Sequence, residues 1–171
     1  FKGKVVEEMY RRLGQLDFPA ELAQLRAAKP DAIYFFLPGG MGVNFIKQFV
    51  AAGMSKDIQL VVPLWGSDQD IIRAVGDPML GLFSVGHWSL DFDNPANRKF
   101  VAEFEKEYRR LPTGYAASGY DTALLMDAAI RKVKGKNENK TALPTAIRAA
   151  DFKSVRGEFK FGKNQFPVQN Y

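Results

Sequence analysis

A run of apolar residues that stops at a proline and two glycines constrains the fold of this chain more than any other feature. Residues 32–37 read Ala-Ile-Tyr-Phe-Phe-Leu, Pro38-Gly39-Gly40 follows, and apolar residues then recur at helical spacing from Met41. This pattern is typical of a buried parallel strand that leads into a helix through a tight loop. Ligands of open α/β sheets bind just beyond the carboxyl ends of the strands. The loop is therefore the first candidate site, and its glycines, which have no Cβ, let the backbone lie close to a ligand.

Strands and helices alternate through the first half of the chain. Strands separated by single helices predict a parallel sheet with right-handed crossovers, and hence an α/β fold. We expect the strands at Lys4–Tyr10, Ala32–Leu37, Gln59–Pro63 and Leu80–Gly86. The helices between them are expected to be one that Asp17 caps and that ends near Pro30, one from about Met41 to Ala52, and a short one that Ser67 caps.

After Trp88 the pattern changes to long amphipathic helices. These helices have apolar faces but no strands between them, so they need a sheet to cover. Either the partner sheet is missing from this sequence, or the helices cover the second face of the first sheet. We favour the first explanation because the chain also begins abruptly, at Phe1. The expected elements are helices at Asn97–Arg110, Tyr115–Val133 and Leu143–Ala150, a charged loop at Lys134–Lys140, and a hairpin of Gly157–Phe161 and Phe166–Tyr171.

Composition and charge exclude several classes of protein. With 171 residues, 46% of them hydrophobic, the chain can bury one sizeable core or two smaller ones. The net charge is +5, but the basic residues are scattered through helices that also carry acids, which favours a solvated surface over a nucleic-acid interface. The absence of cysteine excludes disulfides, thiolate metal sites and cysteine nucleophiles. No apolar run approaches the ~18 residues of a membrane span, and we expect neither a metal nor a cofactor.

The sequence contains parts of two motifs, one for cofactor binding and one for catalysis, but neither motif is complete. The segment from Gly40 to Phe45 begins like a dinucleotide-binding G-x-G-x-x-G, but it lacks the third glycine, and no acidic residue ends the next strand. His87 is the single histidine, and no Gly-x-Ser-x-Gly elbow supplies a serine nucleophile for it. The sequence therefore predicts a protein that is not an enzyme.

Several short motifs follow one another in order along nearly the whole chain. They are Leu22–Phe36 with Pro38-Gly39-Gly40, Trp65-Gly66-Ser67, Asn94-Pro95-Ala96-Asn97 with Phe104 and Tyr108, Pro112 and Tyr115 leading to Tyr120-Asp121-Thr122-Ala123, and Val155–Phe161. No single motif is specific, but the ordered set resembles the periplasmic solute-binding proteins of the leucine/isoleucine/valine type, which serve ABC importers. The resemblance implies a Rossmann-like, parallel-sheet lobe of a type I periplasmic binding protein, together with helices of a second lobe.

The resemblance also implies how the chain is divided. In that family two α/β lobes flank a cleft, and the chain crosses between them three times. Residues 1–89 would form part of lobe 2, residues 90–153 helices of lobe 1, and residues 154–171 would return to lobe 2. The N-terminal half of the protein would then be absent from this sequence. The implied function is that of the solute-binding component of a bacterial ABC importer, located in the periplasm, with the permease of the inner membrane as its partner.

By resemblance, the solute site includes the loops after the strands. Each candidate also has a purely structural interpretation: a strand–helix turn without a ligand, a capped helix beside a packed indole, a packing or hinge role for His87 and Trp88, and a core position for Tyr115. In amino-acid binders of the family an acidic residue near Ser67 and Asp68 holds the ammonium group, but the register is left open here. The candidate ligand-binding residues are Phe36, Pro38, Gly39, Trp65, Ser67, Asp68, Trp88 and Tyr115.

The side chains of Phe36, Pro38, Trp65 and Trp88 suggest a solute with an apolar or aromatic body. In the family, the groups that hold a solute carboxylate lie mainly in the first lobe, outside this chain. A branched-chain or aromatic amino acid, or an aromatic carboxylate, is therefore expected. A ligand-sensing domain of a receptor or regulator with the same fold, and a fragment of an α/β enzyme, remain alternatives. An isolated half should expose an apolar patch, so we also expect it to self-associate.

Overall fold

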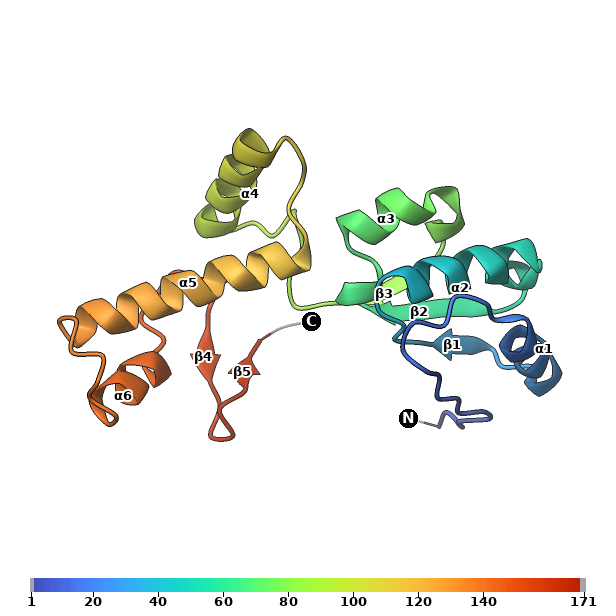
Figure 1. The fold of residues 1–171 in the computed structure, drawn as a ribbon, viewed down its shortest axis with the longest axis horizontal. Helices are drawn as coiled ribbons and strands as arrows, with labels where there is room; N and C mark the ends of the chain where they lie inside the picture. The colour runs from blue at the N-terminus through green and yellow to red at the C-terminus, as the bar shows by residue number, and fades with distance from the viewer. Residues whose placement is uncertain (1, 170–171) are drawn as a thin grey trace. The chain divides into compact units, whose positions relative to one another are not determined.

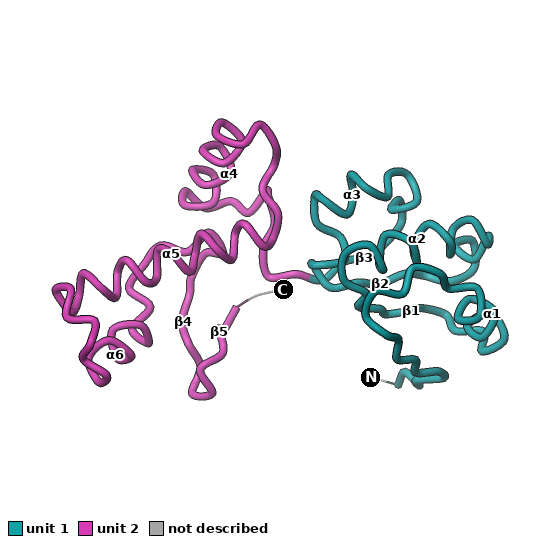
Figure 2. The backbone as a smooth tube through the Cα atoms, in the orientation of Figure 1, with its two compact units in different colours: residues 1–85 teal, residues 86–171 magenta. Residues whose placement is uncertain are grey.

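The computed structural model describes residues 2–169, and the chain divides into two compact units, residues 1–85 and residues 86–171 (Figure 2). The first unit contains α1 (Pro19–Ala28), β1 (Ala32–Tyr34), α2 (Gly40–Ala51), β2 (Gln59–Pro63), α3 (Gln69–Val75) and β3 (Phe83–Val85), with short 3₁₀ helices at Met54–Lys56, Leu64–Gly66 and Asp77–Met79. The second unit contains α4 (Pro95–Tyr108), α5 (Gly114–Lys132), α6 (Ala142–Arg148), β4 (Lys160–Phe161) and β5 (Pro167–Val168) (Figure 1).

The sheet of the first unit is parallel, as the alternation of strands and helices predicts. Its strand order is β1-β2-β3, and each neighbouring pair is parallel. The register aligns Tyr34 with Val61 and Val61 with Phe83. The predicted α/β fold class is thus confirmed, with helices joining successive parallel strands.

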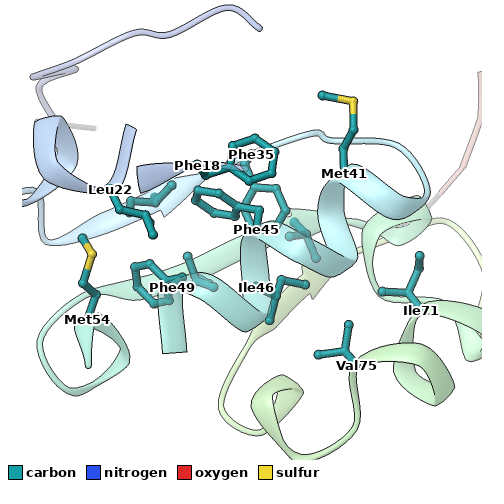
Figure 3. Packing of buried hydrophobic residues seen from close by; sticks show 13 residues of the cluster. Phe18, Leu22, Phe35, Met41, Phe45, Ile46, Phe49, Met54, Ile71 and Val75 are labelled. Carbon is teal, nitrogen blue, oxygen red and sulfur yellow. The ribbon is translucent and has the colours of Figure 1, made fainter. Parts of the chain in front are cut away.

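One face of this sheet forms the core of the first unit. Ile33, Leu60 and Val62 of β1 and β2 belong to a cluster of buried side chains. α2 contributes Phe45 and Phe49 to the same cluster (Figure 3). Three aromatic rings meet there: the Phe45 centroid lies 5.5 Å from that of Phe18 and 4.8 Å from that of Phe35. α1 and α3 join the same cluster through Leu22 and through Ile71 and Val75.

The opposite face of the sheet is exposed. Tyr34 and Phe83, which lie in one row across the strands, are 67% and 64% exposed, and Val85 is 53% exposed. Parallel sheets are almost always covered on both faces. Within the first unit, Tyr34, Phe83 and Val85 therefore have no covering layer. That the helices after Trp88 cover this second face stays a prediction, as does the alternative that they belong to another sheet.

Two expectations for the N-terminal part are wrong. Residues 4–10 pair with no strand among the described residues, and Val5 and Tyr10 are exposed. The reason is that Val5-Val6 and Met9-Tyr10 place apolar residues in adjacent positions, so neither face of a strand would be consistently apolar. At the start of α1 the N-cap position is taken by Phe18 instead of Asp17.

Other boundaries differ more modestly from the expected ones. β1 and β3 are shorter than Ala32–Leu37 and Leu80–Gly86. The cap of α3 is Asp68 instead of Ser67, because the 3₁₀ turn Leu64–Gly66 takes up the residues before it. The predicted strand Phe166–Tyr171 reduces to Pro167–Val168, and its last two residues lie outside the described residues.

The second unit is built on its long helices. α4 begins at a cap in which the Asn94 side chain accepts a hydrogen bond from the Asn97 N–H, and Thr113 caps α5 in the same way. β4 and β5 form an antiparallel hairpin. Within residues 2–169, no helix combines the length and hydropathy of a membrane span, and no group of three potential metal ligands comes together.

Candidate functional site

The loop between β1 and α2 carries three of the predicted residues. Phe35 turns into the core, whereas Phe36 is 54% exposed. Pro38 and Gly39 are also exposed. Gly39 has φ 56° and ψ −129°, a combination that side chains disfavour, and this sharp turn lets α2 begin directly at Gly40. The loop therefore presents an aromatic ring and open backbone just beyond the end of β1.

The first turn of α2 packs unusually close to this loop. A Cβ on Gly42 would lie 2.5 Å from the carbonyl oxygen of Leu37, a distance that real side chains do not reach. Glycine is therefore required at this position for steric reasons, although its φ is ordinary. The close contact fixes where the Leu37 carbonyl, and with it the loop, stands relative to the helix.

The loop between β2 and α3 carries Trp65, Ser67 and Asp68. Trp65 and Ser67 are half-buried. The Ser67 hydroxyl lies 2.5 Å from that of Ser84 on β3, which ties the loop to the neighbouring strand. A Cβ built on Gly66 would lie 3.2 Å from that of Val62, so the turn folds back tightly over its own strand.

Asp68 is committed to the helix that it precedes. Its side chain is only 6% exposed, and its carboxylate accepts a hydrogen bond from the Ile71 N–H at 3.4 Å. Burial raises the pKa of Asp68 above its usual value, and the hydrogen bond from Ile71 acts against that rise. Such a carboxylate is poorly placed to meet the ammonium group of a solute.

The parallel strands bring the two loops to one edge of the sheet. β1 and β2 are direct neighbours, and both run toward the loops that carry Phe36 and Trp65. The two loops therefore place six predicted residues at this edge: Phe36, Pro38, Gly39, Trp65, Ser67 and Asp68, the last of which caps α3. Ser84, which contacts Ser67, is not among the residues expected from the sequence. A polar residue between Phe83 and Val85 in an apolar strand was the signal that could have identified it.

Trp88, in the second unit, is held by its surroundings. It is 5% exposed, and its indole N–H donates to the Asn97 side-chain oxygen at 2.7 Å. The Asn97 amide in turn donates to the carbonyls of Ser89, Leu90 and Phe92, so the indole and the start of α4 form one network. This is the packing role that the sequence left open, and contact between Trp88 and a solute stays a prediction.

Tyr115 and Asp121 lie on the same helix in different environments. Tyr115, in the first turn of α5, is 59% exposed. Asp121 is 1% exposed, and its carboxylate accepts hydrogen bonds from the Ser154 hydroxyl, the Val155 N–H and the Arg156 guanidinium at 2.5, 2.9 and 2.8 Å. Asp121 therefore fastens the segment after α6 to α5.

The charges of Asp121 and Arg156, which form an ion pair, both act on His87. The residue is half-buried, and burial lowers its pKa below the usual value. The positive charge of Arg156 lowers the pKa of His87 further, and the negative charge of Asp121 partly offsets both effects. The neutral imidazole is thus the favoured form in the folded protein.

The second unit also contains an open hollow of about 1060 Å³. It lies between the start of α4, at Asn94 and Ala96, and the segment that carries Arg156 and Phe159. None of the eight predicted ligand-binding residues lines it. The hollow and the predicted loops are therefore separate features, and we assign no ligand to the hollow.

Comparison with known proteins gives a consistent result. The model of a family described as "Periplasmic binding protein" matches residues 1–171. A solute-binding protein of an ABC transporter from R. palustris, solved in complex with benzoate, is 36% identical with a TM-score of 0.92 over 99% of this chain. Another, from Rhodopseudomonas palustris BisB5 in complex with 3,4-dihydroxybenzoic acid, is 33% identical with a TM-score of 0.73 over 90% of this chain.

A curated relative points the same way. Leu/Ile/Val-binding protein homolog 6 of Brucella melitensis is 28% identical over 91% of this chain. The chain spans less than half of each of these proteins: 40% of the Brucella protein and 46% and 42% of the two solved chains.

Proposed function

Because this chain belongs to the periplasmic binding protein family, we propose that it is part of the solute-binding component of a bacterial ABC importer. The observation that carries the proposal is the likeness to the benzoate complex, which extends over 99% of the chain. The mechanism needs no covalent step. A solute docks on one lobe, the other lobe closes over it, and the permease of the inner membrane recognises the closed form in the periplasm.

The proposed division into lobes follows the family. Residues 1–89 form part of one lobe, residues 90–153 contribute helices to the other, and residues 154–171 return to the first. The boundary between the two compact units, after Val85, supports the first crossing. The last crossing is based on the resemblance alone, since Ser154 and Arg156 are bound to Asp121 within the second unit.

Within this proposal, the edge of the sheet after β1 and β2 is one wall of the solute site. Phe36 and Trp65 supply aromatic surface, Pro38 and Gly39 supply close backbone, and Ser67 supplies a hydroxyl. Aromatic side chains can bury a large apolar area at little cost in conformational entropy. For Trp88 and Tyr115, contact with the solute stays a prediction.

We propose an aromatic carboxylate as the solute in preference to an amino acid. An amino acid brings an ammonium group, and Asp68, the acidic candidate for it, is buried and bonded to the Ile71 N–H. An aromatic acid needs only apolar walls here and donors for its carboxylate in the other lobe. The ligands of the two solved relatives, benzoate and 3,4-dihydroxybenzoic acid, are of this class.

A thermal-shift measurement on the full-length protein that contains these residues tests the function. We expect benzoate to raise the unfolding midpoint, because a ligand at about 100 times its Kd stabilises the folded state by ~2.7 kcal/mol. A shift with leucine but not with benzoate would overturn the proposed solute class and keep the importer function. A shift with ATP alone would overturn the function itself.

Matched variants connect the shift to the proposed wall. Phe36→Ala should weaken benzoate binding by roughly tenfold, since removing a buried aromatic contact costs ~1–2 kcal/mol. The control is Phe166→Ala, which removes a ring that is exposed in the turn of the β4–β5 hairpin. Equal effects of the two substitutions would remove Phe36 from the site.

A further inference from the structure

A pair of linked hydroxyl groups stands at the proposed wall. The Ser67 hydroxyl donates to the Ser84 oxygen over 2.5 Å. Ser67 belongs to the turn between β2 and α3, and Ser84 is the central residue of β3. Ser67 is half-buried and Ser84 is exposed, so the pair is open to solvent on the side of β3.

The position of Ser84 in the sheet determines on which face the pair lies. Ser84 is aligned with Val62, which is fully buried beneath the helices, so Ser84 points to the helix-covered face and its neighbours Phe83 and Val85 point to the bare one. An apolar residue would be expected on the covered face. Because Ser84 is exposed and bonded to Ser67, this part of the face is polar and open to solvent.

The chemistry of the pair is that of a donor and an acceptor side by side. A serine hydroxyl has one hydrogen to donate and two lone pairs that accept. The Ser67 hydroxyl has two acceptors within reach, the Ser84 oxygen at 2.5 Å and the Leu64 carbonyl oxygen at 3.4 Å. When its hydrogen makes the shorter contact, the Ser84 hydroxyl can turn its own hydrogen toward a third group or accept from it. A phenolic hydroxyl, which both donates and accepts, matches this arrangement.

We propose that the Ser67–Ser84 pair recognises a hydroxyl on the aromatic ring of the solute, which makes Ser84 a specificity-determining residue. This inference rests on the proposed function. There the other lobe holds the carboxylate, so the far end of the ring approaches the strand ends of this unit. The hydroxyl in question is therefore the one at the position opposite the carboxylate, as in 4-hydroxybenzoate.

The test compares two probes that differ only in that hydroxyl. Dissociation constants for benzoate and 4-hydroxybenzoate are measured by calorimetry on the full-length protein and on its Ser84→Ala variant. The ratio of the two affinities should shift by about fivefold against 4-hydroxybenzoate in the variant, which corresponds to one hydrogen bond. Ser84→Thr keeps the hydroxyl and suits a strand, so it should retain the wild-type ratio.

A second serine provides the matched control. Ser55 is exposed in the 3₁₀ turn before β2, at the opposite end of the strand from Ser67. Ser55→Ala should leave the ratio unchanged. If Ser84 only braces the turn, Ser84→Ala weakens both probes equally, and that result overturns the inference. A wild-type protein that binds neither probe refutes the proposed aromatic-acid solute, on which this inference rests, before any variant is made.

Discussion

The buried carboxylate of Asp121 holds several residues of the second unit in place. Asp121 accepts three hydrogen bonds, and Arg156, which it holds, also donates to the Gln169 side chain and lies over the Phe159 ring at 4.8 Å. Removing one partner from such a pair leaves a buried charge without compensation, which typically costs ~3–5 kcal/mol. His87 reports on this environment because its pKa depends on both charges.

The stability of the protein should depend on pH through His87. Its pKa is lowered on folding, so the unfolded chain binds the proton more readily. The stabilisation is therefore fully present above the unfolded pKa, ~6.5, and is lost as the pH falls toward the folded value. We expect the thermal midpoint to drop between pH 7 and pH 5 by more in the wild type than in His87→Gln.

All other titratable groups are common to both proteins, so the difference between the two curves isolates His87. Parallel curves would show that the imidazole is as easily protonated in the folded protein as in the unfolded chain. A steeper fall in His87→Gln would reverse the sign of the argument.

The first residues of each helix determine how the loop before that helix is placed. Asp68, Asn94 and Thr113 each cap a helix with a side-chain oxygen, in keeping with the residue types that favour this position. α2 starts differently, at a glycine turn, and gains its position from the contact between Gly42 and the Leu37 carbonyl. The loop that carries Phe36 is thus set by packing against the helix.

Gly42→Ala should destabilise the protein even though alanine favours helices. The new Cβ would meet the Leu37 carbonyl oxygen at 2.5 Å, so the loop or the helix must shift. We expect a loss of ~1–3 kcal/mol in the free energy of unfolding, measured by denaturant titration, as for other overpacked sites. Because the shift moves the loop, benzoate binding should weaken as well.

The matched control is another helical glycine. Gly119 lies within α5, and a Cβ built there meets no described atom within 4 Å. Gly119→Ala should therefore be neutral or stabilise by up to ~1 kcal/mol through helix propensity. Equal destabilisation by both substitutions would mean that the close contact at Gly42 is not the cause.

The sheet face opposite the core has no covering layer within the first unit. Tyr34, Val61 and Phe83 form an apolar row across the strands on this face, and Val85 lies two residues further along β3, aligned with Pro63. We predict that the 171-residue chain alone self-associates through this face. Light scattering coupled to size exclusion should give at least twice the mass of one chain at micromolar concentration, and Phe83→Lys should lower it.

Phe166→Lys provides the comparison, because it changes an equally exposed phenylalanine in the turn of the hairpin. A monomer in the wild-type chain would contradict the prediction. An oligomer that only Phe166→Lys dissolves would place the contact on the second unit instead.

Most of the elements were predictable because their signals are local. The strand Gln59–Pro63 was predicted with the bounds that the structure has, and α1, α2, α4, α5 and α6 lie within a few residues of the expected ranges. The strand expected at Lys4–Tyr10 is absent because Val5-Val6 and Met9-Tyr10 place apolar residues next to one another, so neither face of a strand would be consistently apolar. The loops after β1 and β2 were identified as the candidate site because Pro and Gly mark these turns and ligands bind beyond the carboxyl ends of parallel strands.

Local pattern and motif order were enough to establish the α/β class, the parallel sheet and the family, because hydrophobic periodicity and turn residues act over short stretches of chain. Tertiary structure was needed to show that Asp68 is committed to a helix cap, that Trp88 is bonded to Asn97, and that Ser84 meets Ser67. These contacts join residues through the register of strands and the packing of loops, and whether a polar atom is engaged depends on which neighbours the fold brings within about 3 Å of it.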